Sequence, residues 1–158
     1  MKLNFLVIHC TATHEGRVVT SDQIRHWHMA PPPAGRGWSR VGYTDLIHLN
    51  GTIERLLPNN EDDNVDPWEI TNGAVGINFI SRHIVYTGGL KSGTAEAKDT
   101  RTSLQTSALL NYVRNMIRLH PTIRVAGHNQ FAAKACPSFD VPDWLRANNI
   151  PETNIYTS

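Results

Sequence analysis

Apolar segments of strand length alternate with segments of helical period along this chain, and one hairpin interrupts the alternation. The apolar run at residues 3–9 predicts a buried strand. Asn50-Gly51 lies between two β-rich runs, residues 43–49 and 52–57, and is the strongest short hairpin signal in the sequence. Strands and helices that alternate around a hairpin predict one α/β domain, a central mixed sheet flanked by α-helices.

Capping residues and prolines set the bounds of three predicted helices. Thr20 and Gln23 form a capping-box pair, so a helix should cover about residues 21–29 and end at the proline run that follows. The longest helix should cover residues 102–120, where apolar side chains recur on one face. Asp140 is expected to cap a last helix with a proline in its first turn. Two more strands are predicted, at residues 82–87 and 123–126.

The length of the chain bounds its organisation. Its 158 residues suffice for a single domain, with a core over about residues 3–148 and a short C-terminal tail, and are too few for two domains. No apolar run approaches the roughly 20 residues that a membrane span needs. The N-terminus fails as a signal peptide, because its apolar stretch is about four residues long and no small-residue cleavage site follows. We therefore expect synthesis in the cytoplasm and no membrane partner.

Charge and cysteine content narrow the classes of partner. Fifteen basic against 14 acidic side chains give a net charge of +1, which offers no electrostatic case for nucleic acid or anionic lipid. Cys10 and Cys136 could form a disulfide in an oxidising compartment, but without an export signal two free thiols are the stronger expectation. We expect a monomer. Eight histidines are many for this length and direct attention to a metal site.

Three residues stand out as metal ligands. His9 ends the first predicted strand, His128 ends a later one, and Cys136 follows eight residues after His128. Strand ends at the rim of a sheet are where functional side chains gather, and two imidazoles with one thiolate make a plausible zinc set whose fourth position stays open, as in catalytic sites. Taken singly, such a histidine is more often a hydrogen-bonded structural residue and a buried cysteine a small hydrophobe. The spacing alone is therefore weak support.

Two neighbours of these residues have predictable directions. Cys10 follows His9 on a strand, so its side chain should face the other way and belong to the core. Pro137 should hold Cys136 extended, and in an extended segment Lys134 would share its face and point toward the metal. A cation there could stabilise an oxyanion.

The four tryptophans can pack in the core or stack on a ligand. Trp27 and Trp144 lie on predicted helices, and packing is the favoured interpretation for both. Trp38 and Trp68 lie on predicted loops near polar residues and are the better candidates for substrate contact.

With these residues in view, the chain resembles the type 2 amidases, the phage-lysozyme-type N-acetylmuramoyl-L-alanine amidases, which are related in fold to the peptidoglycan recognition proteins. The resemblance extends over roughly residues 4–146, and its last segment is highly specific. Its carriers are Val7-Ile8-His9-Cys10-Thr11-Ala12-Thr13, Ile24-Arg25, Trp27-His28, Val41-Gly42-Tyr43, Asn50-Gly51-Thr52-Ile53-Glu54, Gly88-Gly89, Asp99-Thr100-Arg101-Thr102, Gly127-His128 and Lys134-Ala135-Cys136-Pro137-Ser138-Phe139-Asp140.

The resemblance implies a zinc enzyme that hydrolyses the amide bond between N-acetylmuramic acid and L-alanine in peptidoglycan. It implies that the Zn²⁺ ligands are His9, His128 and Cys136. It also implies that Tyr43 and Lys134 are the catalytic side chains beside the metal. Asn78 matches a position on the loop that borders the substrate cleft.

The chain departs from the family pattern at four places. Thr44 stands where the family often has a histidine, and residues 31–36 look like an insertion. Gly73 takes the place of a loop histidine, while Ser81-Arg82-His83 replaces Ser-Ile-Gly. None of these touches the ligands, so they bear on substrate contacts and peptide preference.

Other functions remain open from the sequence. A non-catalytic peptidoglycan-binding module is one, although Cys136 and Lys134 argue against it. A structural zinc protein would need a fourth ligand, for which Cys10 and His48 are the obvious donors. A cytoplasmic amidase that recycles soluble muropeptides would share the chemistry. A wall-cutting enzyme without a signal peptide would act after lysis or dedicated export, as phage or prophage lysins do.

Overall fold

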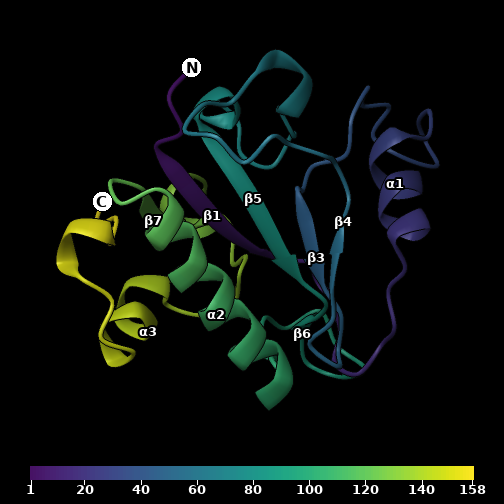
Figure 1. Ribbon diagram of the computed structural model, residues 1–158. Helices are drawn as coiled ribbons and strands as arrows, with labels where there is room; N and C mark the ends of the chain where they lie inside the picture. The colour runs from purple at the N-terminus through teal and green to yellow at the C-terminus, as the bar shows by residue number, and fades with distance from the viewer.

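A five-stranded sheet with the order β4-β3-β5-β1-β7 forms the centre of the computed structural model, which describes residues 1–158 (Figure 1). Strand β1 pairs in parallel with β5 and β7, and β3 pairs in parallel with β5. Only β4 runs antiparallel, against β3. The predicted mixed sheet is confirmed. Its strands are β1 (Phe5–Cys10), β3 (Asp45–Ile47), β4 (Ile53–Arg55), β5 (Ser81–Tyr86) and β7 (Arg124–Gly127), and a second sheet joins β2 (Thr13–His14) to β6 (Gly89–Leu90).

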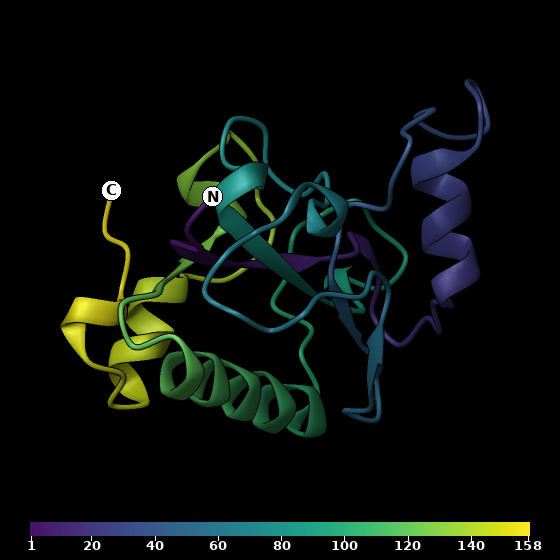
Figure 2. The ribbon, with the colours of Figure 1, turned by 45° about the horizontal axis from the view of Figure 1, so that its top comes forward.

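Helices cover both faces of the sheet, as Figure 2 shows. Helices α2 (Ser103–Leu119) and α3 (Val141–Ala147) pack on one face through the larger apolar core, which includes Leu6 and Ile8 of β1. Helix α1 (Ser21–Met29) packs on the other face through a smaller cluster around Ile24. None of the helices is both long and apolar enough to cross a bilayer. Four short 3-10 helices complete the structure: η1 (Pro67–Glu69), η2 (Asn78–Ile80), η3 (His128–Gln130) and η4 (Glu152–Asn154).

Side-chain caps begin all three α-helices, and those at Thr20 and Asp140 were predicted. Thr20 accepts a hydrogen bond from the Gln23 amide (3.1 Å), and the Gln23 side chain accepts one from the Thr20 amide (2.9 Å). Thr102 and Gln105 form the same reciprocal box at α2, and Asp140 caps α3. Each cap satisfies amide groups that have no partner within the helix, so these starts are fixed locally by sequence.

The hairpin at Asn50-Gly51 is confirmed, with a loop of three residues between the closing pair His48 and Thr52. The amide of Gly51 donates to the carbonyl of His48 (2.9 Å), and the amide of His48 donates to the carbonyl of Thr52 (2.9 Å). Gly51 has φ of +84°, which suits glycine at the last loop position.

The central strands are buried on both faces, and their alternation decides what each face receives. All residues of β1 and β5 are buried. In the parallel register Val7 lies opposite His83 and His9 opposite Val85, so His9 and His83 project from the same face of the sheet. That face is the one that α1 covers only in part. Cys10 projects into the α2 side of the core, as predicted.

We predict that Leu109→Ala lowers the free energy of unfolding by about 2–5 kcal/mol, because truncation leaves a cavity in a close-packed core. Leu109 on α2 is 1% exposed, whereas Leu104 on the same helix is 58% exposed. Leu104→Ala is therefore the matched control and should change stability by less than about 1 kcal/mol. Urea denaturation of both variants checks this, and equal losses would contradict the assigned core.

Candidate metal centre

The three predicted ligands meet at one point of the structure. The ligand atoms of His9, His128 and Cys136 all lie within 4.8 Å of one another. His9 Nδ1 is 3.7 Å from Cys136 Sγ, and the two imidazole rings have centroids 4.7 Å apart. A tetrahedral zinc ion would set its nitrogen and sulfur ligands about 3.6 Å apart. The spacing of the donor atoms therefore fits a divalent ion of this type.

Strand pairing brings these distant residues together. Ile8 of β1 lies opposite Gly127 of β7 in a parallel ladder, so the next residues, His9 and His128, emerge side by side. Cys136 reaches the same point from the loop after η3, where its sulfur accepts a hydrogen bond from the Cys10 amide (3.3 Å). Both cysteines are free thiols.

The electrostatics of the donors suit a cation. Burial, followed by His83 and His128, holds the pKa of His9 well below its usual value, and burial with Lys134 lowers the pKa of His128. Both imidazoles are therefore neutral, the form that binds metals. The hydrogen bond with Cys10 and then burial raise the pKa of the Cys136 thiol. Ionisation of that sulfur needs a compensating positive charge, which a divalent ion supplies.

A cavity of about 140 Å³ opens beside His128. It brings together the two predicted catalytic side chains, Tyr43 and Lys134, with the predicted substrate contact Trp38. The full lining is His28, Arg36, Trp38, Tyr43, Asn72, Gly73, Val75, His128 and Lys134. The cavity thus joins the ligand cluster to a space with a cation, a phenol and an aromatic face.

Tyr43 sits next to the ligands as an uncharged phenol. Its ring centroid is 5.1 Å from that of His9. Burial, reinforced by Cys136, raises the pKa of Tyr43 above its ordinary value. The hydroxyl therefore keeps its proton, which makes it a hydrogen-bond donor and a poor general base.

Lys134 reaches the cavity by a different path from the predicted one. The extended conformation expected for residues 134–136 is wrong, because this segment is a series of bends and turns. The Lys134 amide donates to the Ala132 carbonyl (2.8 Å), and the Ser138 amide donates to the Ala135 carbonyl (2.6 Å). These local bonds, and not strand alternation, direct Lys134 into the cavity.

The other two predicted substrate contacts lie outside the lining of this cavity. Asn78 accepts a hydrogen bond from the Ala74 amide (2.7 Å) and so holds the loop whose residues Gly73 and Val75 border the cavity. Trp68 lies in η1 and is 48% exposed.

Sequence reasoning assigned no function to two buried histidines at the site. His28 accepts a hydrogen bond from the Gly42 amide (2.9 Å) and packs against Trp38 and Tyr43. Burial, and then Arg36, lower the pKa of His28 to about 4. His83 Nδ1 lies 2.9 Å from His9 Nε2. The only sequence signals for them were the Trp27-His28 pair and the departure at His83.

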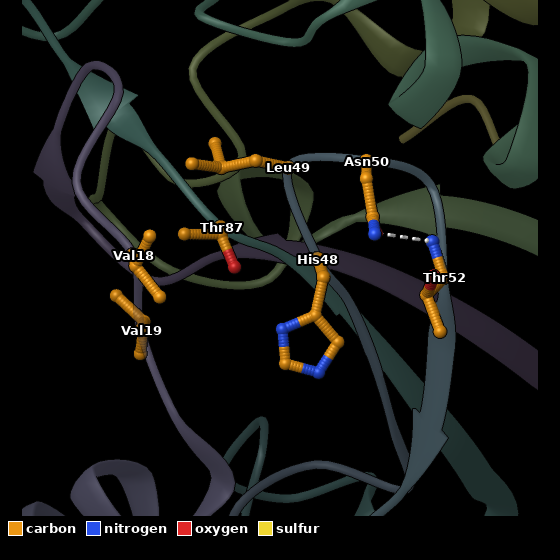
Figure 3. Close-up of a pocket in the computed structure, with 7 residues that line it drawn as sticks. All are labelled: Val18, Val19, His48, Leu49, Asn50, Thr52 and Thr87. Atoms are coloured by element: carbon orange, nitrogen blue, oxygen red, sulfur yellow. Dashed lines mark hydrogen bonds between the residues drawn. The ribbon is translucent and has the colours of Figure 1, made fainter.

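His48, a possible fourth ligand, belongs to a separate cavity of about 360 Å³. Figure 3 shows its ring among the residues that line this space, Val18, Val19, Leu49, Asn50, Thr52 and Thr87. His48 Nε2 is 2.9 Å from Glu54 Oε1. The candidate metal site accordingly has three protein ligands, and neither His48 nor Cys10 is among them.

Comparison with known proteins gives concordant results. The endolysin of Enterobacteria phage K11 is 31% identical over 144 residues, which cover 90% of this chain and 85% of the relative. N-acetylmuramoyl-L-alanine amidase LysC from Clostridium intestinale superposes with a TM-score of 0.71 at 24% identity, covering 95% of this chain and 87% of that chain. Drosophila peptidoglycan recognition protein SA gives a TM-score of 0.69 at 12% identity, covering 99% and 83%. No family model matches the sequence.

We predict that His28→Asn flattens the pH dependence of stability between about pH 6.5 and pH 4. The folded pKa, about 4, lies below the unfolded value of 6.5, so on acidification the unfolded state takes up the proton first and stability falls through this window. Asparagine keeps an acceptor for Gly42 but does not titrate. The slope should decrease by at most about 1.4 kcal/mol per pH unit.

Urea unfolding in the presence of a chelator, at several pH values across this window, measures the effect on the metal-free protein. A variant slope equal to that of the native protein would show that His28 titrates normally in the folded chain.

Proposed function

This chain belongs to the phage endolysins of the type 2 N-acetylmuramoyl-L-alanine amidase family, and we propose that His9, His128 and Cys136 hold the zinc ion with which it works. The protein is a peptidoglycan-cleaving amidase. The bond we propose it hydrolyses joins N-acetylmuramic acid to the L-alanine of the stem peptide.

One observation carries the proposal of zinc. Three donors from segments far apart in the sequence converge within 4.8 Å, and the cavity beside them contains Tyr43 and Lys134. A mixture of imidazole and thiolate suits zinc better than magnesium or calcium, which prefer oxygen. Three protein ligands leave a position for substrate, as a catalytic site requires.

The two side chains beside the ligands, Lys134 and Tyr43, would have different roles in the reaction. A bound zinc ion would supply Lewis acidity, which polarises a carbonyl and acidifies water. Lys134 would hold the negative charge that develops on the oxygen of the scissile carbonyl, a contact stronger in the transition state than in the ground state. Tyr43, which keeps its proton, would donate a hydrogen bond toward the leaving nitrogen.

Substrate contacts extend from the same cavity. Trp38 lines its wall, and we propose that it packs against a sugar ring. Asn78 would act by holding the bordering loop, and Trp68 by contact with a more distant part of the glycan strand. The proposed partner is the cell wall alone, met by a monomer that reaches it after release by lysis or by a dedicated export route.

Two alternative functions predict different effects on peptidoglycan. A binding module with this fold would leave peptidoglycan intact, whereas Lys134 and Cys136 beside an open cavity favour an enzyme. A recycling amidase would cleave soluble anhydro-muropeptides and spare intact sacculi. Mass spectrometry of both digests decides: the proposed enzyme releases peptides with a free N-terminal alanine from sacculi and leaves the glycan strands uncut.

We predict that Cys136→Ser abolishes stoichiometric zinc binding and lowers wall-clearing activity by more than about 1000-fold, because a ligand is lost together with the charge that neutralises the ion. Cys10→Ala is the matched control: it also removes one thiol, but from the core side of β1, and should retain zinc. Metal analysis of the purified proteins checks this. Full zinc content and full activity in Cys136→Ser would overturn the ligand assignment.

We predict that Lys134→Met retains zinc but lowers the turnover rate by about 100- to 1000-fold, the usual effect of removing one oxyanion donor. Lys98→Met is the control, since Lys98 pairs with Glu15 on the surface. Steady-state hydrolysis of a soluble muropeptide measures both. A loss confined to KM would mean that Lys134 contributes to binding only.

A further inference from the structure

His83 is a fully buried imidazole that touches a metal ligand. It lies on β5 with 0% exposure and projects from the same face of the sheet as His9. His83 Nδ1 is 2.9 Å from His9 Nε2, while the other nitrogen of His9, Nδ1, faces Cys136 Sγ at 3.7 Å. The His9 ring is thus held at one nitrogen and presents the other to the ligand cluster.

Coordination of a metal ion through His9 Nδ1 would allow only one direction for this hydrogen bond. A metal ion needs a bare Nδ1 on His9, so the proton must reside on Nε2 and be donated to His83 Nδ1. The reverse arrangement, with His83 Nδ1 donating, would place a proton on His9 Nδ1 and block coordination. The hydrogen bond is therefore compatible with metal binding in only one direction.

The His83 ring makes no other hydrogen bond. Its Nε2 is buried without a hydrogen-bond partner, so the bond to His9 is the only one the ring makes. A buried polar group with an unmet donor destabilises a protein. The backbone of His83 is tied separately to Thr44, through the Thr44 hydroxyl (3.2 Å) and amide (2.8 Å). The unpartnered Nε2 makes this imidazole unfavourable for stability, so the bond to His9 is the contribution that distinguishes it from an apolar side chain.

We infer that His83 is a positioning residue that fixes the orientation and tautomer of His9 for metal binding, an inference that rests on the proposed zinc function. Partners of this kind behind a ligating histidine typically change metal affinity about 10- to 100-fold.

Gly73 provides the space that the His83 ring occupies. A Cβ atom added at Gly73 would lie 2.4 Å from His83 Nδ1 and 2.5 Å from its Cγ. A side chain at position 73 would therefore point into the volume now filled by the His83 ring. Glycine at position 73 and the imidazole at position 83 are therefore sterically coupled: the His83 ring can sit beside His9 only because residue 73 has no side chain.

The decisive measurement is zinc affinity by chelator competition, with the absorption spectrum of the cobalt-substituted protein as a report on ligand geometry. We expect His83→Ala to bind zinc about 10- to 100-fold more weakly and to alter the cobalt spectrum. His83→Asn retains an acceptor near the Nδ1 position and should recover most of the affinity. His83→Leu fills the space without offering an acceptor, so a merely space-filling role predicts that leucine restores the affinity as well as asparagine does.

The contact between position 73 and the His83 ring gives a second test. His83→Gly alone should weaken zinc binding. A Cβ atom at position 73 would lie 2.4 Å from His83 Nδ1 and 2.8 Å from the Gly42 carbonyl oxygen. Gly73→Ala should therefore destabilise the native protein, and should destabilise the His83→Gly variant less, because only the contact with Gly42 remains there, as thermal unfolding will show.

Native zinc affinity and an unchanged cobalt spectrum in His83→Ala would overturn the inference, as would an asparagine variant no better than alanine. Absence of zinc binding by the unmodified protein would instead refute the proposed function itself, so the two failures are distinguishable.

Discussion

Parallel pairing of β1 with its two neighbours is the interaction on which the site depends. The ladder with β7 sets His9 beside His128, and the ladder with β5 sets His83 on the same face. None of these three residues is close to another in sequence, so only the register of the sheet defines their spacing. A slip of one residue in β1 would turn His9 into the core and bring Cys10 to the metal side. The apolar residues that alternate with the histidines, Leu6 and Ile8, oppose that slip by packing under α2.

Burial then determines the chemistry of the assembled groups. Removal from water keeps the histidines neutral and the Tyr43 phenol protonated, while Lys134 remains at the wall of an open cavity. Neutral donors and a neutral phenol therefore surround the proposed ion position, and the cavity beside it is lined by two cationic side chains, Lys134 and Arg36. The low polarity of the sheet face strengthens each of these interactions relative to water.

The features that could be predicted from the sequence were mostly those that a few neighbouring residues determine, such as the starts of helices. Thr20, Thr102 and Asp140 began their helices because a cap is complete within a few residues. The ligands could be proposed from strand ends, and the family resemblance made the choice specific. Lys134 lines the predicted space, but turns after η3 place it there and not the extended segment that was expected. His83 received no function because its partners, His9 and Gly73, adjoin it only through the sheet and a loop, which no local pattern encodes.

Helix α1 stands on its own small cluster of Val19, Ile24, Val41, Leu46, Leu56 and Val85, apart from the larger core behind the metal ligands. Tyr43 packs against this smaller cluster, and its ring also contacts His28, so the cavity wall and the phenol share one apolar support. The strand ladder that sets His9 beside His128 rests on the other core. A shift of α1 would therefore move Tyr43 and the wall together relative to the three ligands.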